Sequence, residues 1–227
     1  NDIVDVAQTE SDVPTSSQTA LELDVETANK KFGIVQFIEN IECQSIIGEE
    51  VTLSFQAKAT SNLDDVRAAI IAWSSTEDAP SKDIVSAWEA EGTNPTLASN
   101  FTYENTPADL NVTTSFAKYS VTATIDTSST TNVAVFIFSN VTGTTAGTDK
   151  LHIGQVQLEK ASSASDFNFE SIDSYFHKCA RHFRGWLETG DASANQNAIA
   201  QGHNVGTTAS RMQLFNPVPF RATPTID

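Results

Sequence analysis

The segment FHKCARHF (176–183) brings together side chains of the types that bind transition metals. His177, Cys179 and His182 lie two and three positions apart. On a helix these spacings turn the three side chains in different directions, whereas paired ligands on a helix stand four residues apart on one face. The spacing therefore predicts no metal site, and we expect this segment to be a structural helix.

Other parts of the sequence do not indicate enzyme chemistry. The chain has four histidines and 29 acidic residues, but no nucleophile elbow, zinc-protease helix, phosphate-binding loop or dinucleotide-binding turn. His152 occupies an alternating position of a strand-like run, as expected for a surface or hydrogen-bonded structural histidine. No two carboxylates are marked by spacing as an acid and base pair. We therefore expect a protein without enzymatic activity.

Aromatic residues point to a different chemistry, the binding of sugars. Sugar rings have apolar C–H faces that stack on aromatic rings, and polar side chains can hydrogen bond with their hydroxyl groups. The candidate glycan contacts are Trp73, Trp88, Glu89 and Tyr103. Trp73 ends an apolar run, so a core position is its alternative. Trp88 lies in a long polar segment, where it could instead anchor the loop.

Composition and charge restrict the partners. At 39% hydrophobic and 19% charged residues the chain is globular, and it begins at Asn1 without an initiator methionine, as expected of a fragment or processed product. The net charge of −16 argues against a nucleic-acid partner, because such binding depends on clustered Lys and Arg. No apolar run reaches 18 residues, so we expect no membrane insertion. We expect no cofactor, although oxygen-rich loops near Asp78, Asp83 or Asp149 would suit Ca²⁺.

The segments that must position these residues have the patterns of short β-strands. Residues 51–59 (VTLSFQAKA) and 119–125 (YSVTATI) alternate apolar and polar side chains, which predicts strands with one buried face. Residues 32–39, 66–73 and 132–138 are continuously apolar, as in central strands covered on both sides or strands that line a groove. In residues 151–159 (LHIGQVQLE) the apolar phase shifts by one, which predicts a bulge near Gly154.

These patterns predict an all-β fold. We expect an antiparallel jelly-roll β-sandwich, followed by a short helix and a small C-terminal β segment. The expected divisions are a linker or the end of an upstream element (1–20), the sandwich (21–170), a connecting helix (171–185) and the start of a C-terminal β domain (186–227).

The helix and the two cysteines carry further expectations. An apolar stripe of Phe176, Cys179 and Phe183 should dock the helix as a structural joint. Cys43 and Cys179 both sit among apolar residues, which favours buried free thiols, with a single disulfide between them as the alternative.

Residues 32–59 (FGIVQFIENIECQSIIGEEVTLSFQAKA) resemble the first half of a domain found in bacteriophage tail-fibre and other virion proteins. In that family a QxIE strand, a VTLSFxAKA strand and a later QLE strand build a jelly roll like that of carbohydrate-binding modules, and a helix with the pattern CxRYF follows. The matching residues are Gln36, Ile38, Glu39, Gly48, residues 51–59, Gln157, Leu158, Glu159, Cys179, Arg181 and Phe183. His182 replaces the usual Tyr. Residues 217–226 (PVPFRATPTI) resemble the strand that comes next, and the resemblance extends over residues 20–227.

The resemblance implies a virion protein of the particle surface or tail. It would be a structural part of a tail fibre or similar appendage, assembled with other virion proteins as a homotrimer and able to bind a host cell-surface polysaccharide. A capsid decoration protein or head fibre is the nearest alternative, and a secreted bacterial polysaccharide-binding module is a further one.

Overall fold

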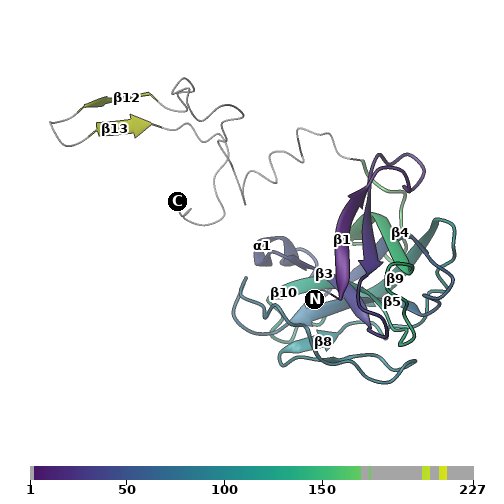
Figure 1. The fold of residues 1–227 in the computed structure, drawn as a ribbon. Coiled ribbons are helices and arrows are strands. Elements are labelled where there is room, and N and C mark those ends of the chain that lie inside the picture. Colours follow the sequence, from purple (N-terminus) through teal and green to yellow (C-terminus); the bar gives the residue numbers. More distant parts are fainter. Residues whose placement is uncertain (1–2, 170–173, 175–200, 205–209, 214–227) are drawn as a thin grey trace. The chain divides into compact units, whose positions relative to one another are not determined.

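A computed structural model of the chain describes residues 3–169, 174, 201–204 and 210–213 (Figure 1). The chain forms two compact units, Asn1–Phe167 and Asn168–Asp227. The described elements are β1 (Val4–Thr9), β2 (Ala20–Val25), β3 (Phe32–Ile38), α1 (Asn40–Cys43), β4 (Glu50–Ala59), β5 (Val66–Trp73), β6 (Val85–Ala87), β7 (Thr96–Leu97), β8 (Phe101–Tyr103), β9 (Ala117–Thr124), β10 (Asn132–Ser139), β11 (Lys150–Glu159), β12 (Gln201–Asn204) and β13 (Ser210–Gln213).

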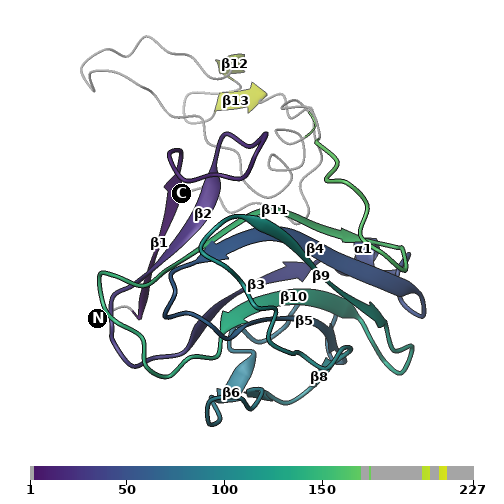
Figure 2. The same cartoon turned by 90° about the vertical axis from the view of Figure 1, so that its right-hand side faces the viewer.

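Two antiparallel sheets make up the first unit. One has the strand order β1-β2-β11-β4-β9 and the other the order β3-β10-β5-β8. They stack face to face in Figure 2, with β4 and β11 in the upper layer and β10 and β5 in the lower layer. The fold is an all-β jelly-roll sandwich, which confirms the predicted fold class. None of the described helices is long and apolar enough to cross a membrane.

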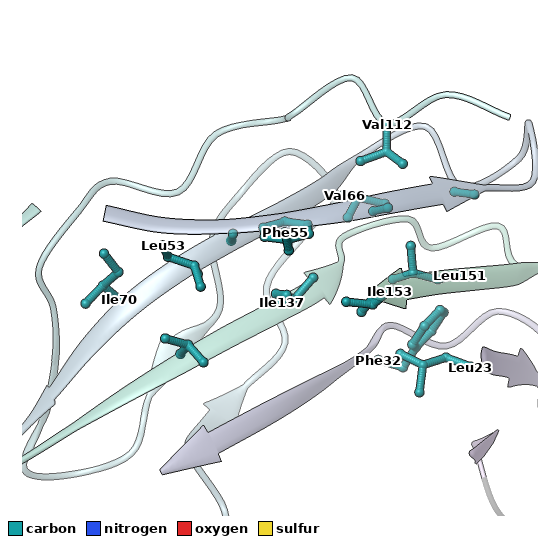
Figure 3. Packing of buried hydrophobic residues seen from close by; sticks show 14 of the residues in the cluster. Leu23, Phe32, Leu53, Phe55, Val66, Ile70, Val112, Ile137, Leu151 and Ile153 are labelled. Carbon is teal, nitrogen blue, oxygen red and sulfur yellow. The ribbon is translucent and has the colours of Figure 1, made fainter. Parts of the chain in front are cut away.

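Alternation along β4 supplies one side of the core between the sheets. Val51, Leu53 and Phe55 point inward and are almost completely buried, and Ile70 and Ile137 of the other sheet belong to the same cluster (Figure 3). Burying one such side chain contributes about 1.5–3 kcal/mol. This shared core fixes which face of the four-stranded sheet remains on the outside.

The bulge predicted in the last long strand is present in β11. The register between β11 and β4 shifts between Gly154 and Gln157, and Gln155 adopts a positive φ of 51°. Because of this extra length, Ile153 before the bulge and Leu158 after it both face the core.

The continuously apolar strands have two different positions. All residues of β5 and β10 are buried, which confirms the expectation of central strands. In contrast, β3 is an edge strand that pairs, among the described residues, with β10 alone, and only Phe32 of its seven residues is buried. An apolar run by itself does not show whether a strand is paired on both sides or on one side only.

Residues 1–20, expected to be a linker or the end of an upstream element, contribute a strand to the sandwich. Residues 4–9 form β1, which pairs with β2 and places Val4 opposite Val25 and Val6 opposite Leu23. Val4 also packs against the core of the sandwich. Residues 10–19 connect β1 to β2.

Several predictions lie outside the described residues. They include the connecting helix, apart from Ser174, and the structural joint formed by Phe176, Cys179 and Phe183. In the second unit, β12 and β13 pair in antiparallel fashion. Cys43 is a free, buried thiol, as its apolar surroundings predicted.

Candidate functional site

The outer face of the four-stranded sheet carries a second apolar cluster. Alternate residues of β5 and β10 that point away from the main core form it together with β8, and residue Ile84 of the 74–100 segment packs on them. The buried members are Ala69, Ile71, Trp73, Ile84, Phe101, Ala134, Phe136 and Phe138. A sandwich that carries aromatic side chains on an outer sheet face, covered only in part by a loop, has a candidate binding surface there.

Trp88 lies on top of this cluster. Its ring centroid is 6.2 Å from those of both Phe136 and Phe138, which stack on each other at 4.6 Å. Trp88 as a whole residue nevertheless remains 39% exposed. The ring of Trp88 is therefore packed against two phenylalanines in a residue that remains partly open to solvent, and glycan contact by Trp88 stays a prediction.

Gly33 of the neighbouring strand β3 makes room for the phenylalanine pair. A Cβ atom on Gly33 would lie 2.6 Å from Phe136 Cε2 and 2.6 Å from Phe138 Cβ. Gly33 itself is exposed, so the sheet has an open backbone stretch beside the two rings. The sequence signal for this feature is a glycine within an apolar strand.

Trp73 and Tyr103 have structural surroundings. Trp73 is only 6% exposed, packs 4.6 Å from Phe101 and donates its indole N–H to the Thr76 carbonyl at 2.9 Å. Trp73 thus has the core position that its place at the end of an apolar run offered as an alternative to glycan contact. Its ring is too deeply buried to stack on a ligand. Tyr103 donates its hydroxyl to the Pro95 carbonyl at 2.9 Å. Burial raises the pKa of Tyr103 to about 12, against the opposing charge of Arg67.

Glu89 follows Trp88 directly. Its half-buried carboxylate accepts a hydrogen bond from Thr96 Oγ1 at 2.6 Å. Glu91 is held in a similar way, because the Thr142 amide and hydroxyl both donate to it. These bonds lower the pKa of Glu91. The structure thus places all four predicted residues on one side of the sheet, with Trp88 and Glu89 at its surface.

Two buried cations that the sequence analysis missed anchor the loop. Lys31 Nζ donates to the Ala90 carbonyl at 3.0 Å and also to Asn140. Arg67 donates to the Asn94 side chain at 2.8 Å and to the Gly92 carbonyl at 3.2 Å. The loop that carries Trp88 is therefore tied to the ends of β3 and β5.

Asp65 completes this network. It accepts two bonds from Arg67, at 2.6 and 2.9 Å, and one from Asn140 at 3.0 Å. Burial by itself would raise the pKa of Asp65, but these bonds and the charges of Arg67 and Lys31 outweigh it, and the pKa is lowered. A sequence signal existed, since Arg67 interrupts an apolar strand that otherwise has no charge.

The aspartates considered for Ca²⁺ hold loops together. Asp149 accepts bonds from Thr60 Oγ1, Asn62 Nδ2 and the Thr145 amide, at 3.0, 2.6 and 2.7 Å. Asp78 accepts from the Asn40 amide and Asn132 Nδ2, both at 2.8 Å. Asp83 is exposed. Among the described residues, no group of three His, Cys, Asp or Glu side chains is arranged to hold a metal ion.

Comparison with known proteins finds similarity only among solved structures. No protein-family profile and no curated protein sequence matches the chain. The enzymatically active domain of bacteriophage CBA120 tailspike protein 4 is 19% identical with a TM-score of 0.39, over 71% of this chain but only 18% of that chain. A family 16 carbohydrate-binding module is 10% identical with a TM-score of 0.41, over 68% of this chain and 84% of that one. The family 22 xylan-binding domain from Paenibacillus barcinonensis is 10% identical with a TM-score of 0.39, over 71% and 83%.

Proposed function

We propose that this chain is a non-enzymatic glycan-binding module whose contact surface is centred on Trp88. The observation that carries the proposal is the position of Trp88, a residue that is 39% exposed while its ring packs on a stacked phenylalanine pair. A binding residue is most effective when packing already fixes its conformation, because less entropy is lost on binding. The Lys31 and Arg67 anchors give the Trp88 loop that support.

The surroundings of Trp88 favour a neutral glycan. A sugar would place its apolar C–H face on the indole, and its hydroxyl groups could reach the Glu89 carboxylate. Glu89 and Glu91 both follow Trp88 closely in sequence, and the chain carries a net charge of −16. Sialic or uronic acids would meet repulsion there, because like charges raise the cost of approach.

We further propose that the module belongs to a virion appendage such as a tail fibre and binds a host-surface polysaccharide. What supports this placement is the sequence resemblance over residues 20–227, together with an architecture suited to a binding module. A capsid decoration protein or head fibre, and a secreted bacterial polysaccharide-binding module, are the alternatives. Antibodies against residues 3–169 should label tails in electron micrographs of intact particles, whereas capsid labelling would favour the first alternative.

The binding proposal is tested with a glycan array and titration of the full chain. We expect binding to at least one neutral glycan, with no cleavage of it. Trp88→Ala should weaken the affinity about ten-fold or more, which corresponds to about 1.4 kcal/mol, whereas Trp88→Phe should retain most of it. Ile41→Ala is the matched control, because Ile41 is also exposed and apolar but lies on α1. Binding that Trp88→Ala leaves unchanged would refute the proposal.

A further inference from the structure

The strand β3 has a composition that is unusual for the edge of a sheet. β3 is the terminal strand of its sheet, and within the described part of the chain only β10 pairs with it. Its seven residues, FGIVQFI, contain no charge and no proline. Natural proteins usually protect long apolar edges with charged side chains, proline or a covering segment, because free edges pair with other strands.

Hydrogen bonds at both ends of β3 show which backbone groups face this edge. The Lys30 amide donates to Thr144 Oγ1, and the Ile38 carbonyl accepts from Asn132 of β10. Even-numbered residues therefore direct their backbone groups toward β10, and alternation directs those of Gly33, Val35 and Phe37 outward. The Phe37 carbonyl already accepts a hydrogen bond from the Gln36 side chain at 3.1 Å, which a pairing strand would replace. With that exchange, the outward groups can pair with another strand.

The edge is complementary to itself. Lys30, which is exposed, precedes the strand and Glu39 follows it, so antiparallel pairing of two copies brings opposite charges near each other at both ends. Lys31 does not take part, because it is held beneath the Trp88 loop. Only one register pairs all seven residues with their counterparts, and in it Val35 faces Val35 of the second copy. The same register places Phe37 of each copy opposite Gly33 of the other, beside the Phe136 and Phe138 side chains that occupy the space over Gly33.

We propose that two copies of this chain associate through antiparallel pairing of their β3 edges about a twofold axis at Val35. The two four-stranded sheets become one continuous sheet. Such pairing is isologous, with the same residues used on both copies. A single strand edge is small beside the ~1,200–2,000 Å² of a stable interface, so the dimer is a weak one. This twofold arrangement differs from the trimer that the sequence resemblance implies.

Pairing would also double the candidate binding surface. In each copy β10, which carries Phe136 and Phe138, is the neighbour of β3. The two β10 strands would stand three strand spacings apart, about 14 Å, with both Trp88 rings on the same face. This consequence rests on the proposed glycan binding, whereas the dimer itself does not. Two linked sites bind a repeating polysaccharide more strongly than one.

The proposed dimer is tested by placing charges at Val35, which faces itself across the twofold axis. Full-length chain is studied by sedimentation velocity and native mass spectrometry from about 1 to about 500 μM, a range suited to weak association. We expect a monomer–dimer equilibrium in the unmodified chain. Val35→Lys and Val35→Asp should each weaken self-association about ten-fold or more, because like charges then face each other directly. Mixing the two variants should restore a one-to-one heterodimer.

The same substitutions at Val121 are the matched control. Val121 is a partly buried valine on β9, the edge strand of the other sheet, so its variants should leave the dimer intact. If the Val35 variants do not fold, amide hydrogen exchange of the unmodified chain tests the dimer instead. The Val35 and Phe37 amides should become protected from exchange as the protein concentration rises. A monomer at every concentration, a trimer insensitive to charge at residue 35, or protection independent of concentration would overturn the proposal.

Discussion

Removing the Arg67 guanidinium should strongly destabilise the sandwich and its Trp88 loop. Arg67 is 8% exposed and forms hydrogen bonds with both Asp65 oxygens, Asn94 and Gly92. Arg67→Met keeps most of the side-chain volume but leaves the Asp65 carboxylate without its main partner. Breaking a buried ion pair in this way costs about 3–5 kcal/mol. Asp65 keeps the Asn140 bond and the nearby Lys31 charge, so we expect about 3 kcal/mol.

Urea unfolding of the full chain measures this loss, and a double variant identifies its cause. Asp65→Asn combined with Arg67→Met removes the unpaired buried charge. The double variant should therefore be more stable than Arg67→Met alone by at least about 1 kcal/mol. If Arg67→Met costs less than about 1 kcal/mol, or if the two effects simply add, the network does not hold the loop through this ion pair.

Three further predictions concern single sites. The lowered pKa of Asp65 adds stability at neutral pH that is lost as the pH falls below about 4, so Asp65→Asn should flatten the acid limb of a stability–pH curve measured by thermal unfolding. Gly33→Ala should cost about 1–3 kcal/mol by overpacking against Phe136 in urea unfolding, whereas Gly143→Ala should be nearly neutral because no atom lies within 4 Å of the new Cβ. Burial raises the pKa of Cys43, so in a Cys179→Ser variant a thiol reagent at pH 8 should modify Cys43 only after denaturation. Rapid modification of the folded protein would contradict its buried position.

The strands that the sequence predicted correctly are those whose neighbours impose a clear pattern. β4 alternates because one of its faces meets the core, and the phase shift in β11 identifies its bulge. β1 was missed because most of its side chains are exposed, although Val4 and Val6 alternate. The edge position of β3 was missed for the opposite reason, since its composition is that of a central strand.

The candidate site could be predicted only in part, because it is built from residues far apart in the sequence. Trp73 and Trp88 are both tryptophans close to a strand end, yet one is buried and one exposed. What distinguishes them is the covering of the outer sheet face, where Phe101 packs on Trp73 while Trp88 rests on Phe136. The anchors Lys31 and Arg67 reach loop atoms up to 59 positions away. Local patterns carry little information about such contacts.

The distribution of charge links the loop anchors to ligand preference. The chain has only 13 Lys and Arg residues against 29 Asp and Glu, yet Lys31 and Arg67 are both buried beneath the Trp88 loop. Their charges are used within the protein, where Asp65 faces Arg67 and both cations bind loop carbonyls. Little positive charge is left for an anionic ligand, while Glu89 remains next to the ring. For the proposed site we therefore expect a preference for ligands held by ring stacking and neutral hydrogen bonds, because neither contribution requires a cation at the site.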